Sequence, residues 1–542
     1  MQATGATRTP SSGRAAFFVS AVTLAGRAVG LVRTLVLTSI LGITYLGNTY
    51  ASANAVPNLL YEIIAGGVLA ASLLPAIAGP ASERDEATVE RTASAVLNRA
   101  LLIMTPVVLL GMVFRKPVVS LLTSGVADPV VRAMEQRLAA FLLLMFLPQI
   151  WLYVVGVVLT AVLHGYHRFT APALAPLLSS VVVTASYLLY GVIEGPNADD
   201  LEAVSRTGQL VLGLGTTLGV AVLSLSLVLP AQRLGLAWRP VLSVPETARR
   251  RIGPLLVPAV VTVLSQQAFL AVVLVVANRV EGGVVAYQLA FTLLLVFWAV
   301  FPLPMATTTF PGLAAVAVRN DSEFARQCAE AGRRVVLIVL GAAALMISVA
   351  DAGASLVLAL GAGGGARSKT MVAWTVAAFA LGLVGYGLHA YYTRAAYALG
   401  DGRSPSVAAF AGFGLATVLA LIAPVVYSGA QLIAALAGAF SIGIMVGAAL
   451  LLAMFRRKAG RACLEGIGAA AARGLGAGVA AGFTGVALAA WITGGSLLQE
   501  LLRTGVATVA AVTVYILFQA LLGEREVAGL LMRLRRTEAE HP

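Results

Sequence analysis

Two arginines interrupt an apolar stretch near the beginning of the chain, in the segment AGRAVGLVRTLVL at residues 25–37. A central arginine raises the free energy of membrane insertion by about 2.5 to 3.5 kcal/mol, so Arg27 and Arg33 need a compensating partner. Arginine stays charged at physiological pH, and its planar guanidinium donates two parallel hydrogen bonds to a phosphate group. These residues therefore favour the binding of an anion in a water-filled cavity of a membrane protein.

Two structural explanations stay open beside the anion cavity. Each side chain can extend toward the nearer membrane surface, which is easier for Arg33, about 12 Å from the end of its span, than for Arg27, roughly 18 Å from its start. One arginine can also form a buried ion pair with Glu62, in the segment PNLLYEIIAGG, although the other arginine then lacks a partner.

Other polar side chains in the apolar stretches are candidates for lining such a cavity. They are Asn48, Asn54, Asn58, Glu62, Gln266, Gln288 and Arg394. The glutamines can instead form hydrogen bonds between helices, and Arg394, within about two turns of a predicted helix end, can reach the membrane surface.

A candidate hinge lies in the second apolar stretch. Pro57 removes a helix hydrogen bond there, and the pair Gly66 and Gly67 loosens the turns that follow. The pattern is equally compatible with a helix that bends during function and with a fixed kink.

Residue types needed for catalysis or metal binding do not occur in recognisable patterns. The 4 histidines lack ligand spacing, and the 2 cysteines, Cys328 and Cys463, fall in predicted cytoplasmic segments where no disulfide is expected. No nucleotide-binding loop or catalytic triad occurs. We expect no enzyme activity, no metal site and no cofactor.

The elements that carry these residues are predicted to be membrane-spanning helices. The chain has 542 residues, of which 59% are hydrophobic and 11% charged, and its mean hydropathy is +0.91. The apolar runs are too long, and lack the alternation, for a β-barrel. The predicted fold is an all-α polytopic membrane protein with fourteen spans, at 16–41, 48–80, 93–114, 133–163, 169–193, 207–230, 253–278, 283–318, 335–362, 370–399, 405–427, 430–455, 474–495 and 503–523.

The distribution of basic residues predicts that both termini are cytoplasmic. With that orientation most of the 37 lysines and arginines, including RRR at 249–251 and RRKAGR at 456–461, lie on the cytoplasmic side, and the loop EGPNADDLEAVSR lies outside. The net charge of +13 then reflects topology and attraction to anionic lipids, and we expect no nucleic-acid partner.

A weak internal repeat predicts two lobes of six spans each. SLLPAIAG at 72–79 aligns with TTFPGLAA at 308–315, and GYHRFTAP at 165–172 aligns with GDGRSP at 400–405. The predicted parts are a cytoplasmic tail (1–15), an N-lobe (16–230), a linker (231–252), a C-lobe (253–455), a second linker (456–473), two further helices (474–523) and a cytoplasmic tail (524–542).

Three stretches of the chain carry a family resemblance, and the most specific part lies in the first eighty residues. GRAVGLVRTLVLTSILG, GNTYASANAVPNLLYEIIAGGVLAASLLPAIA and LTAVLHGYHRFTAPALAPLLSSV are similar to the MurJ (MviN) family of lipid II flippases, within the multidrug/oligosaccharidyl-lipid/polysaccharide exporter superfamily, and resemble its actinobacterial branch. The resemblance implies two lobes that alternate between inward-open and outward-open states in the bacterial cytoplasmic membrane. It also implies that Arg27 and Arg33 bind the diphosphate of a polyprenyl-linked muropeptide, and that the last two spans form a groove for the lipid tail.

The sequence departs from the family at several positions. Thr34, Asn48, Tyr61 and Thr292 stand where the family often has acidic or basic residues. Either Arg394 and polar side chains compensate, or the substrate is a different polyprenyl-diphosphate glycan. Two other functions stay open: a non-transporting scaffold that recruits cell-wall synthesis or division proteins, and a drug or cation antiporter, which would need more buried carboxylates. The glycan, the driving force and the oligomeric state are not predicted.

Overall fold

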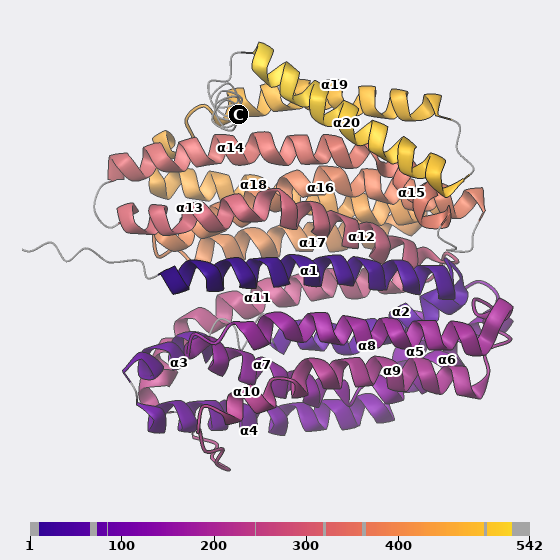
Figure 1. The fold of residues 1–542 in the computed structure, drawn as a ribbon, viewed down its shortest axis with the longest axis horizontal. Helices are drawn as coiled ribbons and strands as arrows, with labels where there is room; N and C mark the ends of the chain where they lie inside the picture. The colour runs from indigo at the N-terminus through magenta and orange to yellow at the C-terminus, as the bar shows by residue number, and fades with distance from the viewer. Residues whose placement is uncertain are drawn as a thin grey trace, which may run out of the picture. The chain divides into compact units, whose positions relative to one another are not determined.

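The structure is a computed structural model in which residues 10–64, 73–83, 85–243, 245–317, 321–359, 365–492 and 496–522 are described (Figure 1). These residues form α-helices joined by short turns, and they contain no strand. The chain divides into two compact units. Unit 1 comprises Met1–Leu41 and Tyr45–Gln267, and unit 2 comprises Gly42–Thr44 and Ala268–Pro542. The predicted all-α class is confirmed.

Unit 1 contains the first helices of the chain. They are α1 (Pro10–Leu41), α2 (Tyr45–Glu62), α3 (Leu73–Ser82), α4 (Glu86–Val113), α5 (Arg115–Leu122), α6 (Pro129–Phe146), α7 (Gln149–Gly165), α8 (Thr170–Glu194), the 3₁₀ turn η2 (Gly195–Asn197), α9 (Arg206–Leu225) and α10 (Val228–Gln232). Helix α11 (Glu246–Ala277) is divided between the two units.

Unit 2 contains the remaining helices. They are α12 (Gly283–Val300), α13 (Pro302–Ala317), α14 (Asp321–Ser348), α15 (Ala350–Ala359), α16 (Ala366–Ala398), α17 (Arg403–Val426), α18 (Gly429–Ala459), the 3₁₀ turn η3 (Arg461–Leu464), α19 (Ile467–Trp491) and α20 (Leu497–Leu521).

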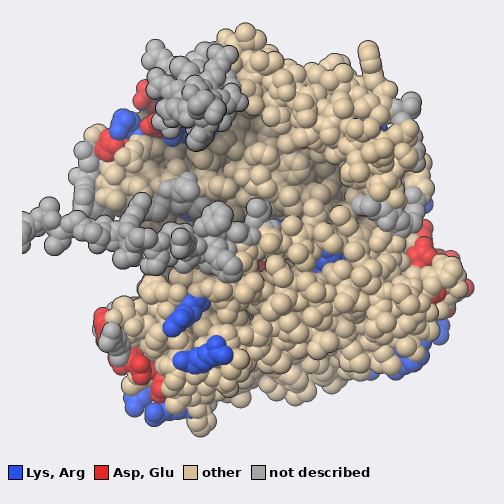
Figure 2. Space-filling model, viewed as in Figure 1, with Lys and Arg blue, Asp and Glu red and all other residues tan. Residues whose placement is uncertain are grey.

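Twelve helical segments among the described residues are long and apolar enough to cross a membrane, judged by length and composition. They correspond to twelve of the fourteen predicted spans, whereas those at 16–41 and 48–80 are not among them. The count of fourteen therefore stays a prediction. The face in Figure 2 agrees with a membrane protein, because most of it carries neither Lys and Arg nor Asp and Glu.

Prolines divide helices that the apolar pattern joins into single spans. The predicted span 133–163 consists of α6 and α7, which meet at Pro148, and the span 283–318 consists of α12 and α13, which meet at Pro302. Proline has no N–H to donate to the preceding turn, so the helix direction can change at such a residue. Apolar periodicity alone does not reveal these breaks.

Helix α2 also carries the predicted hinge. Pro57 lies buried inside the helix, and the last described turn, at Ile63 and Ile64, widens to a π-helical turn, a local irregularity that is frequent at functional sites. Gly66 and Gly67 lie outside the described residues. The hinge stays a prediction.

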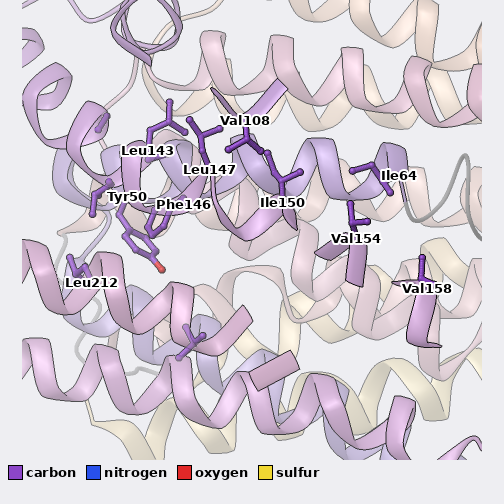
Figure 3. Close-up of a cluster of buried hydrophobic side chains, with 14 of the residues drawn as sticks. Tyr50, Ile64, Val108, Leu143, Phe146, Leu147, Ile150, Val154, Val158 and Leu212 are labelled. Carbon is purple, nitrogen blue, oxygen red and sulfur yellow. The ribbon is translucent and has the colours of Figure 1, made fainter. Parts of the chain in front are cut away.

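A buried apolar cluster fills the interior of unit 1. Figure 3 shows how Leu143, Phe146, Leu147, Ile150 and Val154 project from α6 and α7 toward their neighbours, and all five are 2% exposed or less. Close helix contacts complete the packing. A Cβ atom on Gly156 of α7 would lie 2.6 Å from the Ser224 hydroxyl of α9, so a small residue is required there.

The last helices of unit 2 pack on α14. Helices α14 and α19 contact each other extensively, as do α19 and α20. At the start of this hairpin, the 3₁₀ turn η3 brings Cys463 against Cys328 of α14. Both residues are fully buried free thiols, and the Cys463 thiol donates a hydrogen bond to the Ala459 carbonyl oxygen over 3.1 Å. Their proximity was not apparent from the sequence.

Candidate functional site

Arg33 is a partly buried cation on α1 in unit 1. Helix α1 packs along α8, which carries Tyr187, and it also contacts α2, which carries Tyr50. No hydrogen bond or ion pair joins the Arg33 guanidinium to another residue in the described part of the chain. Arg33 therefore keeps all its donors available for a ligand, beside a wall of aromatic side chains.

The aromatic wall beside Arg33 is internally hydrogen-bonded. The Tyr50 hydroxyl lies 2.8 Å from the Tyr187 hydroxyl and 2.7 Å from the Thr216 hydroxyl. The Tyr50 ring meets Tyr187 and Phe146 edge to face, with centroid distances of 5.7 and 5.9 Å. Because these groups satisfy one another inside the core, they hold the surroundings of Arg33 in a fixed geometry.

Arg27 lies six residues earlier on α1, and its side chain is exposed. It too forms no hydrogen bond or ion pair within the described residues. A spacing of six residues places two side chains about 120° apart around a helix, so Arg27 and Arg33 leave α1 on different sides. Arg27 and Arg33 can bind the same ligand only because both side chains are long and flexible.

The ion-pair explanation for the arginines is not realised. Glu62, at the end of α2, is exposed and forms no ion pair with Arg27 or Arg33 in the described part of the chain. Of the three explanations that the sequence left open, the pairing with Glu62 therefore receives no support.

Asn58 is positioned by an aromatic neighbour. The Tyr153 hydroxyl donates a hydrogen bond to the Asn58 side-chain oxygen over 2.8 Å. The Tyr153 ring also packs against Tyr61, with a centroid distance of 4.3 Å and an angle of 35° between the rings. Tyr61 stands where the family resemblance places an arginine, so an aromatic pair replaces a cation at this point.

Tyr61 and Tyr153 also line a cavity of about 350 Å³. It is formed by α2, α7, α8 and α9, where α7 ends, α8 begins and α9 ends. Its lining residues are Tyr61, Tyr153, Gly156, Val157, Thr160, Ala161, His164, Pro172, Ala175, Pro176, Leu223, Ser224 and Leu227. No Lys, Arg, Asp or Glu is among them, so the cavity suits a neutral ligand.

The other predicted polar residues are spread over both units. In unit 1, Asn48 is fully buried, Asn54 is half-buried on α2, and Gln266 is half-buried on α11. Gln288 on α12 and Arg394 on α16 belong to unit 2. The Arg394 guanidinium donates to the Ala390 carbonyl oxygen over 3.1 Å. Their predicted role in a shared cavity stays a prediction.

Sequence reasoning missed the tyrosines and one buried carboxyl. Tyr50, Tyr153 and Tyr187 lie in apolar runs, where a tyrosine is as compatible with a core as with a binding site. Glu135 on α6 is fully buried, and one of its oxygens accepts a hydrogen bond from Thr49 over 3.3 Å. A carboxyl group within an apolar run is a signal that could have singled it out.

The arrangement can bind an anion and an adjoining neutral group. Within the described residues, no three His, Cys, Asp or Glu side chains gather as a metal site would require. The chemistry that these residues offer is recognition by charge, stacking and hydrogen bonding.

Comparison with known proteins identifies relatives that share one description, and the longer matches cover most of the chain. Residues 37–502 match the family model described as lipid II flippase MurJ. The lipid II flippase MurJ of Burkholderia cenocepacia is 25% identical over 401 residues, which are 72% of this chain and 74% of that protein. The probable lipid II flippase MurJ of Haemophilus influenzae is 23% identical over 397 residues, 71% of this chain and 75% of that protein.

A shorter match is to the probable lipid II flippase MurJ of Buchnera aphidicola, which is 23% identical over 165 residues. The matched part is 30% of this chain and spans about a third (32%) of that relative's length.

Solved structures show the same fold. A lipid II flippase MurJ in an inward closed conformation superposes with a TM-score of 0.72 at 17% identity, covering 93% of this chain and 99% of that chain. An inward-facing multidrug resistance MATE family transporter of the MOP superfamily superposes with a TM-score of 0.63, also at 17% identity, over 81% of this chain and 98% of that one. At these identities the structures establish the architecture alone.

Proposed function

The chain belongs to the lipid II flippase MurJ family, and we propose that it carries lipid II from the inner to the outer leaflet of the bacterial cytoplasmic membrane. The observation that carries this proposal is the partly buried guanidinium of Arg33, which forms no hydrogen bond or ion pair with any other described residue of the chain. A cation kept unpaired within an apolar helix needs an anionic ligand, and the diphosphate of lipid II is one.

The arginines have separate roles in this proposal. A bare diphosphate does not cross hydrocarbon, because its charges would lose their water. Arg33 replaces that water with charge-assisted hydrogen bonds, and the exposed Arg27 attracts the diphosphate before it reaches Arg33. Both residues act without forming or breaking a covalent bond.

The lipid tail is assigned to the last two helices. Helices α19 and α20 border an apolar groove of about 690 Å³, lined by residues such as Leu488, Leu502 and Val509. A groove of this character can hold a polyprenyl chain while the polar part of the molecule occupies the protein interior. The transport cycle is alternating access, in which α2 bends at Pro57 and the π-helical turn that follows.

Depletion of the protein tests the transport proposal. Cells that lose it are expected to accumulate lipid II in the inner leaflet and to show less lipid II to a probe that reaches only the outer leaflet. If lipid II is unchanged while another polyprenyl-diphosphate glycan is redistributed, that glycan is the substrate. If every such lipid is unchanged, the chain is a scaffold for cell-wall synthesis proteins and not a flippase.

Complementation of the depleted cells tests the role of Arg33. Arg33→Ala is expected to lower transport about tenfold or more, because charge-assisted hydrogen bonds to a phosphate are lost, and Arg33→Lys is expected to retain part of the activity. Arg99→Ala is the matched control, since Arg99 is an exposed arginine of α4 in the same unit. Full activity of an inserted Arg33→Ala protein would remove Arg33 from the site.

A further inference from the structure

We infer that the cavity below Tyr61 and Tyr153 is a saccharide subsite, which binds the sugar adjoining the diphosphate of the transported lipid. The inference rests on the proposed function and names the residues that would recognise the glycan. Four observations in unit 1 support it: the position of the cavity, its lack of charge, its aromatic pair and its unpartnered polar groups.

The cavity adjoins the proposed diphosphate position. Helix α8 lines part of the cavity with Pro172, Ala175 and Pro176, and the same helix packs along α1, which carries Arg33. In a polyprenyl-diphosphate glycan the first sugar is bonded directly to the diphosphate. In our proposal the first sugar extends from a diphosphate at Arg33 into the cavity at Tyr153.

The composition of the cavity excludes the charged parts of the ligand. Its volume of about 350 Å³ falls within the range of small-molecule sites, and none of its lining residues is Lys, Arg, Asp or Glu. A phosphate or a peptide carboxylate would find no counter-charge there, whereas a sugar is neutral and rich in hydroxyl groups.

The aromatic pair provides a stacking surface. Tyr61 packs on Tyr153 at a centroid distance of 4.3 Å, and Tyr153 is fixed in turn by its hydrogen bond to Asn58. A sugar ring carries C–H bonds on its face, and the electron-rich face of a tyrosine attracts these positively polarised hydrogens. The two tyrosines are thus held in fixed positions and present a flat aromatic surface on which a sugar ring can stack.

The remaining walls supply hydrogen-bonding groups without internal partners. The side chains of Thr160, His164 and Ser224 form no hydrogen bond with other described residues, and the Ser224 hydroxyl is fully buried. A buried polar group without a partner costs folding free energy, which a ligand hydroxyl would recover. A purely apolar occupant, such as a lipid tail, would leave the buried Ser224 hydroxyl unsatisfied.

The test compares two lipids on the purified full-length protein in lipid nanodiscs. One lipid is a polyprenyl diphosphate, and the other is the same lipid carrying its sugar headgroup. Tyr61→Leu is expected to weaken binding of the glycosylated lipid about three- to tenfold and to change binding of the sugar-free lipid less than twofold. Tyr61→Phe keeps the ring and is expected to bind both lipids nearly as the wild type does.

Two controls keep the outcomes separate. Tyr427→Leu alters an exposed tyrosine of unit 2 and is expected to change neither affinity. Thr160→Val keeps the shape of the side chain, removes its hydroxyl and is expected to weaken only the glycosylated lipid. Equal losses for both lipids in Tyr61→Leu would overturn the saccharide subsite and leave the diphosphate site standing. Failure of the wild type to bind either lipid would overturn the proposed function together with the subsite.

Discussion

Two arginines on apolar helices of this chain have opposite surroundings. Arg503 on α20 is almost fully engaged, because its guanidinium contacts the Asp351 carboxylate at 2.6 Å and the Ala489 carbonyl oxygen at 3.0 Å. Arg33 has no such partner within the described residues. The first arrangement stabilises the fold, and the second leaves binding capacity for a ligand. The distinction depends on partners brought from distant parts of the chain, so the sequence alone could not make it.

A carboxylate at the start of α17 makes a pH-dependent contribution to stability. Asp401 accepts hydrogen bonds from the backbone N–H groups of Arg403 and Ser404, and pairs with Lys458 at 2.7 Å. Burial alone would raise the pKa of Asp401, but the hydrogen bonds from Lys458 and Ser404 outweigh it and hold the pKa below its usual value.

We predict that Asp401→Asn lowers the free energy of unfolding by roughly 0.5 to 1 kcal/mol at pH 7, because the ion pair with Lys458 is lost while the amide oxygen can still accept the two backbone hydrogen bonds. Because the pKa is depressed in the folded state, the stabilising effect is present above the unfolded pKa of about 3.9 and is lost as the pH falls through the folded value. Thermal unfolding of the purified variant at pH 7 and at pH 3 measures the difference. If the variant lost the same free energy of unfolding at both pH values, the effect would not be ionic. Asp199→Asn serves as the control.

At the scale of elements, an ion-pair network joins α20 to α15 and α16 within unit 2. Asp351 of α15 contacts both Arg503 of α20 and Lys369 of α16, the latter at 3.2 Å. Arg503 also lies 3.5 Å from Glu500 on its own helix. Because three helices meet at one carboxylate, the network fixes this end of α20 against its neighbours.

We predict that Arg503→Ala loosens α20, because Asp351 and Glu500 lose a shared cation. Faster proteolysis between α19 and α20 in the folded protein, relative to Arg457→Ala at an exposed position, would report the change. In a double-mutant cycle, Arg503→Ala and Asp351→Ala are expected to be clearly non-additive in the free energy of unfolding. Simple additivity would show that the contact is energetically neutral.

The helices themselves could largely be predicted from the sequence, and their breaks could not. Long apolar runs leave no alternative to helices in a membrane, because every backbone group must find its hydrogen bond within the segment. Pro148 and Pro302 interrupt such runs without changing their hydropathy, so α6 with α7, and α12 with α13, read as single spans. The stacking of Tyr61 on Tyr153 depends on how α2 packs against α7, which no local pattern encodes.

At the scale of the whole molecule, the orientation in the membrane is open to a direct test. We predict that both termini are cytoplasmic, because basic residues gather in the segments placed on that side. Both native cysteines are fully buried, so single cysteines can be introduced into the otherwise unchanged chain. Glu202→Cys is expected to react with an impermeant maleimide in intact cells, and Arg457→Cys only after the cells are permeabilised. The reverse labelling pattern would invert the predicted topology.

The alkylation rate of the buried thiols of Cys328 and Cys463 can measure local opening in unit 2. Cys463 lies in η3, which packs against α14, the helix of Cys328, at the point where the chain passes from α18 to the hairpin of α19 and α20. A buried thiol is alkylated only after the structure around it opens, so the alkylation rate depends on how often η3 separates from α14. The two native cysteines thereby report the motion of α19 and α20 relative to α14, without any engineered cysteine.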